Sequence, residues 1–134
     1  MKAGLFKGNV SILSEIALKP HRPCYRKYMM NEKDYRVFSL FASSVRKKFP
    51  TARIWAFGSR VYATFTEDSD LDVCVVTDTL NETIDLSVME IAWQVGFEHD
   101  LLISTITYSH EEFEHGPCSK SSLIHTILEQ GVAA

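Results

Sequence analysis

The sequence predicts an α/β protein in which a small mixed β-sheet is flanked by helices. Three observations support this fold class. The chain has 134 residues, of which 46% are hydrophobic, which suits one packed domain. Amphipathic helical segments alternate with short apolar strands along the chain. Residues 70–77, DLDVCVVT, are apolar on both faces towards their end, as in a strand covered by helices on each side.

The first helix is expected to begin at Asn31, which can cap it, with Glu32 and Asp34 in the first turn. The apolar positions that recur at helical spacing are Phe38, Phe41, Val45 and Phe49. Basic residues follow in the last turn before Pro50, where they suit the helix dipole. These signals together predict an amphipathic helix.

The remaining elements follow from apolar periodicity and from Gly or Pro at their ends. Gly58-Ser59 should end the first strand, and Gly96 should cap the second long helix. We expect a strand at 52–57, a short helix at 59–65, a strand at 70–77, a helix from about Thr83 to Val95, a strand at 98–108 and a helix at 121–131.

Residues 1–28 differ from the rest of the chain and are predicted to be an N-terminal extension to a domain at 29–134. They hold two of the four prolines and show little periodicity. Because Met29 and Met30 directly precede the first helix, one hypothesis is that the native product begins there. The alternative is a short element that packs on the edge of the domain.

Composition argues against a membrane-spanning protein and against a protein that chiefly binds nucleic acid. No apolar run approaches the roughly 18 residues of a membrane span, and no signal peptide is recognisable, so we expect a cytoplasmic protein. Cys24, Cys74 and Cys118 are too widely spaced for a zinc or redox pair and should be free thiols. Residues 30–134 carry eight Lys/Arg against sixteen acids. This acidic balance argues against nucleic acid as the chief partner.

Asp70 and Asp72 are the first candidates for chemistry. They are two residues apart in a strand, so they point to the same face with Cα atoms about 6.5 Å apart. Two carboxylates so placed repel each other unless a cation lies between them. Oxygen ligands of this kind suit Mg²⁺ or Mn²⁺, and a pair of such ions can stabilise both oxygens of a phosphoryl-type displacement.

Two further features would complete such a site. Asp100 is expected at the start of the third strand, where it could supply a third carboxylate. Gly58 at a strand-to-helix turn would permit close backbone approach, and the following amides and the Ser59 hydroxyl could bind phosphate oxygens. A triphosphate cradle would then lie beside a metal site.

These residues carry a family resemblance. Gly58, Ser59, Asp70 and Asp72 match the G-S-x10-D-x-D signature of the polymerase β-like nucleotidyltransferases, and FGSRVYATFTEDSDLDVCVV is similar to the minimal nucleotidyltransferases. The resemblance extends over residues 31–131. It departs at Ala63, where the family commonly has glycine.

The resemblance implies a polymerase β-like nucleotidyltransferase fold and transfer of a nucleoside monophosphate from ATP to a hydroxyl. Asp70 and Asp72 would hold two Mg²⁺ ions, with Mn²⁺ as a substitute. Asp100 would bind the second ion and help to deprotonate the acceptor. Gly58 and Ser59 would grip the phosphates, and Arg60, beside the cradle, could add a phosphate contact.

The resemblance also implies a partner. Minimal nucleotidyltransferases pair with helical HEPN-domain ribonucleases as antitoxin and toxin, so a tyrosine of such a toxin would be the acceptor of AMP. Two alternatives stay open, namely a non-catalytic antitoxin that acts by binding alone and a transferase for small molecules of the aminoglycoside type. No direct contact with nucleic acid or membrane is expected.

The segment HEEFEH at 110–115 has two histidines, but they are five residues apart. On a regular helix they would lie about 140° apart, whereas the zinc motif H-E-x-x-H needs a spacing of four. On this argument a zinc site is not expected here.

Overall fold

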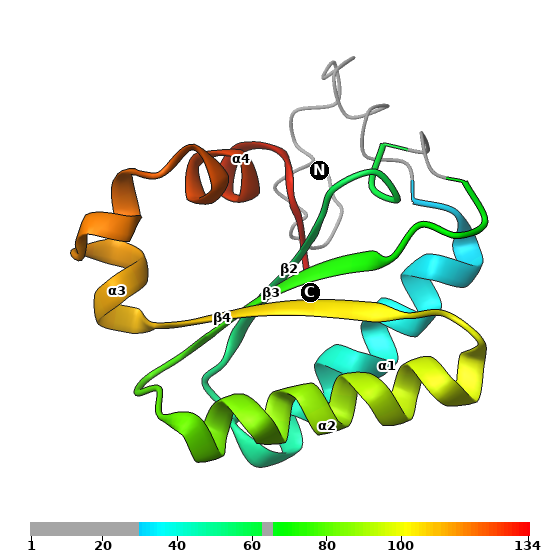
Figure 1. Cartoon of the computed structure of the whole chain (residues 1–134), viewed down its shortest axis with the longest axis horizontal. Helices are drawn as coiled ribbons and strands as arrows, with labels where there is room; N and C mark the ends of the chain where they lie inside the picture. The colour runs from blue at the N-terminus through cyan, green and yellow to red at the C-terminus, as the bar shows by residue number, and fades with distance from the viewer. Residues whose placement is uncertain (1–29, 63–65) are drawn as a thin grey trace, which may run out of the picture.

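The computed structural model describes residues 30–62 and 66–134 (Figure 1). The extension expected at 1–28, its cysteine Cys24 and the departure at Ala63 lie outside the described residues. In chain order the elements are α1 (Glu32–Lys48), β2 (Arg53–Phe57), β3 (Leu71–Thr77), α2 (Glu82–His99), β4 (Ile103–Ser109), α3 (His110–Glu114), the 3₁₀-helix η2 (Pro117–Lys120), α4 (Ser122–Gln130) and β5 (Val132–Ala133).

The sheet is mixed, as predicted, and has the strand order β4-β3-β2-β5. β3 pairs in parallel with β4, whereas β2 runs antiparallel to both β3 and β5. The parallel pair requires a crossover connection, and α2 supplies it. The pairs at the start of β3 position the site. Phe57 of β2 lies opposite Asp72, and Ile103 of β4 lies beside Leu71.

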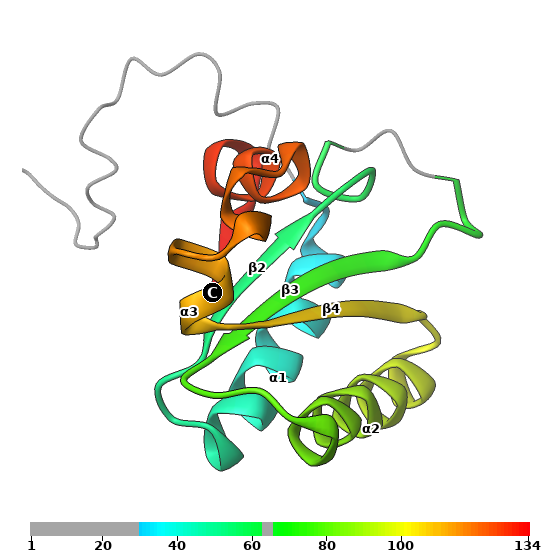
Figure 2. The ribbon, with the colours of Figure 1, turned by 60° about the vertical axis from the view of Figure 1, so that its left-hand side comes forward.

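Helices cover both faces of the sheet. α1 and α2 lie on one face, and α3 and α4 lie on the other (Figure 2). β3 contributes to both cores, since Val73 and Val75 pack with α1 and α2 while Cys74 and Val76 pack with Phe113 and α4. Burial on both faces explains why this strand is a nearly continuous apolar run.

α1 forms as its sequence predicts. The Asn31 side chain accepts a hydrogen bond of 2.7 Å from the amide of Asp34, and Phe38 and Phe41 are fully buried. One first-turn acid, Asp34, is buried as well, which the helix pattern did not indicate. It forms an ion pair with Arg60.

Two boundaries differ from the predictions. α2 continues to His99, and the left-handed residue Asp100 (φ 55°) caps it, so Gly96 lies inside the helix. The Leu101 amide bonds back to the Gly96 carbonyl, and a Cβ on Gly96 would lie 2.4 Å from the Leu101 carbonyl oxygen. Glycine is therefore needed here because the chain folds back tightly over the last turn. β4 consequently begins at Ile103, five residues later than predicted.

The C-terminal part contains elements that periodicity did not predict. α3 and η2 are too short to show a helical repeat, and β5 has only two residues. α3 is nevertheless marked locally by a capping box between Ser109 and Glu112. No helix in the described part of the chain is long and apolar enough to cross a bilayer. Cys74 and Cys118 are free thiols, as predicted.

Candidate active site

The turn after β2 begins the candidate site. Gly58 has φ +85°, a left-handed conformation that glycine adopts without a steric cost. The amides of Val61 and Tyr62 bond back to the carbonyls of Gly58 and Ser59, so the chain makes a tight turn directly after the strand. The short helix predicted at 59–65 is such a turn over its described residues.

The turn lies directly against one of the two predicted carboxylates. Phe57 pairs with Asp72, and a Cβ placed on Gly58 would be 2.4 Å from the Oδ2 atom of Asp72. No side chain can occupy that space while the carboxylate stays where it is. Gly58 is thus required both for its backbone angle and for the close approach of Asp72.

Gly58→Ala is expected to displace the Asp72 carboxylate or the turn, because the new methyl group and the carboxylate oxygen cannot both fit. A displacement on the order of 1 Å at a catalytic group can lower the rate about a hundredfold. We expect a loss of that size in steady-state transfer assays. Gly116→Ala, at a glycine with φ −77° between α3 and η2, is the control and should retain activity.

Asp70 and Asp72 interact, as their spacing predicts. Burial raises the pKa of Asp72 above its ordinary value, and the negative charge of Asp70 raises it further. Both side chains are half-buried. A divalent cation would relieve the repulsion and replace the lost hydration, so this donor set fits Mg²⁺ or Mn²⁺.

The raised pKa of Asp72 has a consequence for stability. A carboxyl whose pKa is higher in the folded state favours folding when it is protonated, and that contribution is lost as the pH rises through the folded-state pKa. In EDTA at neutral pH, Asp72→Asn should therefore melt at a higher temperature than the wild type. The difference should shrink as the pH falls towards 4, measured by circular dichroism. A difference that is independent of pH would contradict this assignment.

Arg60 is buried and makes contacts with α1 and with the segment before Asp70. Its guanidinium is buried and donates to the Asp34 carboxylate at 2.8 Å, with further bonds to the carbonyls of Ser69 at 2.8 Å and Glu67 at 3.4 Å. These contacts connect α1 to the segment directly before Asp70. These contacts suit a positioning role for Arg60, and the phosphate contact stays a prediction.

Asp100 does not start β4. It is exposed, caps α2 and lines a surface hollow of about 280 Å³ with residues of the last turns of that helix. Among the described residues, the carboxylates of Asp70, Asp72 and Asp100 do not gather within 4.8 Å of one another. The assumed strand position of Asp100 was wrong because the helix continues further than its apolar pattern shows.

The residue beside Asp72 on the neighbouring strand is Ser104. The two are paired in the parallel register, so their side chains lie on the same face of the sheet. Ser104 also lines a groove of about 570 Å³ together with Asp70. Sequence reasoning missed Ser104, since only the register of β3 and β4 places it there.

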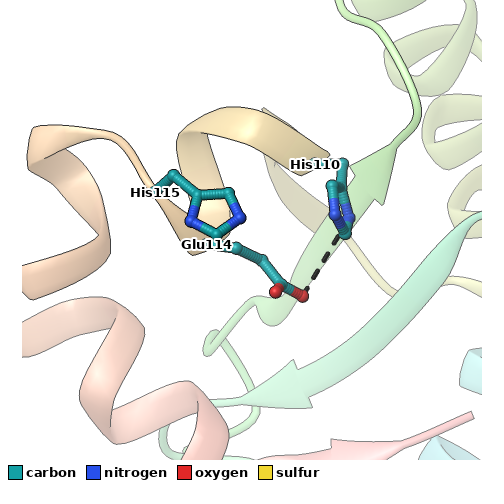
Figure 3. A group of neighbouring side chains, drawn as sticks. All are labelled: His110, Glu114 and His115. Atoms are coloured by element: carbon teal, nitrogen blue, oxygen red, sulfur yellow. Dashed lines mark ion pairs between the residues drawn. The ribbon is translucent and has the colours of Figure 1, made fainter.

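Three ligating side chains do gather at the other end of β4. His110, Glu114 and His115 bring one ligand atom each within 4.8 Å of one another (Figure 3). α3 ends at Glu114 and His115 leaves helical geometry (φ −128°), so the 140° separation assumed for a regular helix does not apply. The prediction that His110 and His115 lie too far apart to share a ligand is therefore wrong.

Arg53 already supplies a positive charge to this cluster. Its guanidinium lies 2.9 Å from the Glu114 carboxylate and 3.2 Å from Nδ1 of His110, and it stacks over Trp55 and Phe113. All three ligating residues are exposed. A metal ion would have to displace the arginine, so we assign the cluster to the Arg53 ion pair.

Comparison with known proteins gives the family. Residues 39–133, which include Gly58, Ser59, Asp70 and Asp72, match the family model described as "Nucleotidyltransferase domain". The chain is also similar to a crystal structure of a Sulfolobus solfataricus protein provisionally described as a nucleotidyltransferase, with 17% identity over 76% of this chain and 82% of that chain and a TM-score of 0.43. No curated protein matches. Because the family model covers most of the chain, including both predicted motifs, the protein belongs to the nucleotidyltransferase domain family.

Proposed function

We propose that this protein transfers AMP from ATP to a tyrosine hydroxyl of a helical HEPN-domain toxin and acts as its antitoxin. The observation that carries the transferase part is the contact between the Gly58 turn and the Asp72 carboxylate, with Asp70 beside it. The turn and the two carboxylates are the parts that a nucleotide and its metal would need, and they come together from two adjacent strands.

Each group has a distinct task in this proposal. Asp70 and Asp72 would hold divalent cations, which when bound neutralise the triphosphate and stabilise the leaving pyrophosphate. Gly58 has no side chain to hinder a phosphate, and the Ser59 hydroxyl would donate to a phosphate oxygen. The acceptor hydroxyl would attack the α-phosphate, lose its proton and release pyrophosphate.

The proposal rests on Asp70 and Asp72 and does not depend on Asp100. Asp100→Asn and Ser104→Ala, assayed side by side, decide which residue contributes. If Asp100 binds metal, its replacement should reduce transfer nearly as much as loss of Asp72. If Asp100 only caps α2, both transfer and the melting temperature should change little, because Asn tolerates the left-handed cap conformation as well as Asp does.

The acceptor is proposed to be a protein because the described domain has few elements beyond those that build the sheet and its two helical layers. The purified chain, Mg-ATP and a purified helical HEPN-domain protein should be incubated together. The intact mass of the partner should increase by one adenylyl group at tyrosine. A complex whose partner mass stays unchanged would instead establish the non-catalytic binding function. Labelling of an aminoglycoside in its place would establish the small-molecule reaction.

A further inference from the structure

α2 exposes a row of large apolar side chains that its own domain does not cover. Leu86, Met89, Trp93 and Phe97 are spaced by three, four and four residues, so they lie on one side of the helix. They are 50–75% exposed, and Leu102, directly before β4, is 62% exposed. We call these five residues the apolar stripe. Patches of this kind on a protein surface mark interaction sites.

The stripe is pre-organised and lies beside β4, the edge strand of the sheet in the described part of the chain. The rings of Trp93 and Phe97 stack at 5.2 Å with 9° between their planes, which makes a flat aromatic surface. β4 is the outer strand of the sheet on this side, and α2 runs alongside it (Figures 1 and 2). The groove between them is lined by Met89 and Trp93 at one wall and by Ser104 to Thr107 at the other.

The groove also reaches the candidate active site. Asp70 lines it together with Ser104, so a molecule that lies along the groove can contact Asp70. An acceptor hydroxyl could therefore be delivered to the site by whatever binds the stripe. This links the surface to the proposed transfer reaction.

The charge of this surface indicates what kind of partner it can bind. The sequence has no lysine or arginine between Arg60 and Lys120. Acids are frequent on α2 and its cap, namely Glu82, Asp85, Glu90, Glu98 and Asp100. Two copies packed through α2 would bring these acids together without a counter-charge. A partner that combines apolar side chains with Lys or Arg would be complementary in both respects.

We propose that the α2–β4 groove with its apolar stripe is the docking surface for the acceptor protein, which presents an apolar surface rimmed by lysine and arginine and places its hydroxyl at Asp70. This inference rests on the proposed function for the identity of the bound molecule as an acceptor. The contact itself requires neither nucleotide nor metal.

A designed helical peptide of about 18 residues, roughly five turns, tests the surface. It has leucine on one face, lysine on the other and one tyrosine, and a second peptide carries glutamate in place of lysine. In a Trp55→Phe background, fluorescence of Trp93 reports binding without nucleotide or metal. The Leu/Lys peptide should shift Trp93 emission to the blue and bind at least about tenfold more tightly than the Leu/Glu peptide.

Variants establish where the peptide binds. Phe97→Ser should weaken binding of the Leu/Lys peptide about tenfold, as expected for an aromatic anchor. Glu90→Lys with Glu98→Lys should also weaken it and reduce its salt dependence. Leu128→Ser is the control, since Leu128 is 56% exposed on α4 at the other face of the sheet. It should leave the affinity within about twofold.

Three results would overturn the docking surface: equal binding of both peptides, no effect of Phe97→Ser, or a dimer of the free chain in sedimentation that Phe97→Ser dissociates. None of these three results would contradict the proposed transfer reaction itself. Peptide binding without any transfer in the Mg-ATP mass assay would remove the proposed reaction and leave the surface intact. Transfer to the HEPN protein that is insensitive to Phe97→Ser would remove the docking surface and leave the proposed reaction intact.

Discussion

Replacing Asp70 and Asp72 together by asparagine should lower nucleotidyl transfer by about a thousandfold or more. The two carboxylates are the groups that hold divalent cations in the proposed reaction, and amides cannot neutralise a metal-bound triphosphate in the same way. The fold should survive, because the substitution removes the repulsion that contributes to the raised pKa of Asp72. Partner mass after incubation with Mg-ATP measures the first effect, and thermal unfolding in EDTA measures the second.

Asp68→Asn provides the matched control for this experiment. Asp68 is an exposed acid in the same segment, two residues before Asp70, so its loss changes the local charge without touching the site. Transfer should be retained. If the metal-free double variant is unfolded, or if it transfers AMP at the wild-type rate, the assignment of both aspartates as metal ligands is wrong.

Asp34→Asn should produce the largest loss of stability, about 3–5 kcal/mol in the free energy of unfolding. Asp34 and Arg60 form an ion pair of 2.8 Å whose side chains are 2% and 7% exposed, so the guanidinium would stay buried after losing its counter-charge. Urea denaturation followed by circular dichroism measures the change. Glu32→Gln is the control, because the exposed pair of Glu32 with Arg36 at 3.6 Å should contribute less than about 1 kcal/mol.

A double variant separates stability from positioning. Asp34→Leu with Arg60→Met removes both charges at once and should recover part of the lost stability, since no unpaired buried ion remains. It also removes the bonds from Arg60 to the carbonyls of Ser69 and Glu67, which lie directly before Asp70. Transfer should therefore remain impaired after stability recovers. Full recovery of both stability and transfer in the double variant would show that Arg60 has no positioning role.

The sequence by itself determined the fold class, the order of the long elements and the combination of the Gly58 turn with Asp70 and Asp72 at the start of β3. These features follow from local rules: side chains alternate along a strand, helices repeat every 3.6 residues, and glycine accepts a positive φ. The raised pKa of Asp72 and its contact with Gly58 agree with that pattern. The family match confirms the transferase class that the motif predicts.

Only the tertiary structure decided which residues accompany those aspartates. The length of α2 moved Asp100 out of β4, and the register of two distant strands placed Ser104 beside Asp72. Arg60 turned inward because Asp34, 26 residues earlier in the chain, is buried opposite it. His110 and His115 lie close together because α3 ends between them, at Glu114. Such contacts depend on how elements pack against one another, and periodicity within a single segment contains no information about that packing.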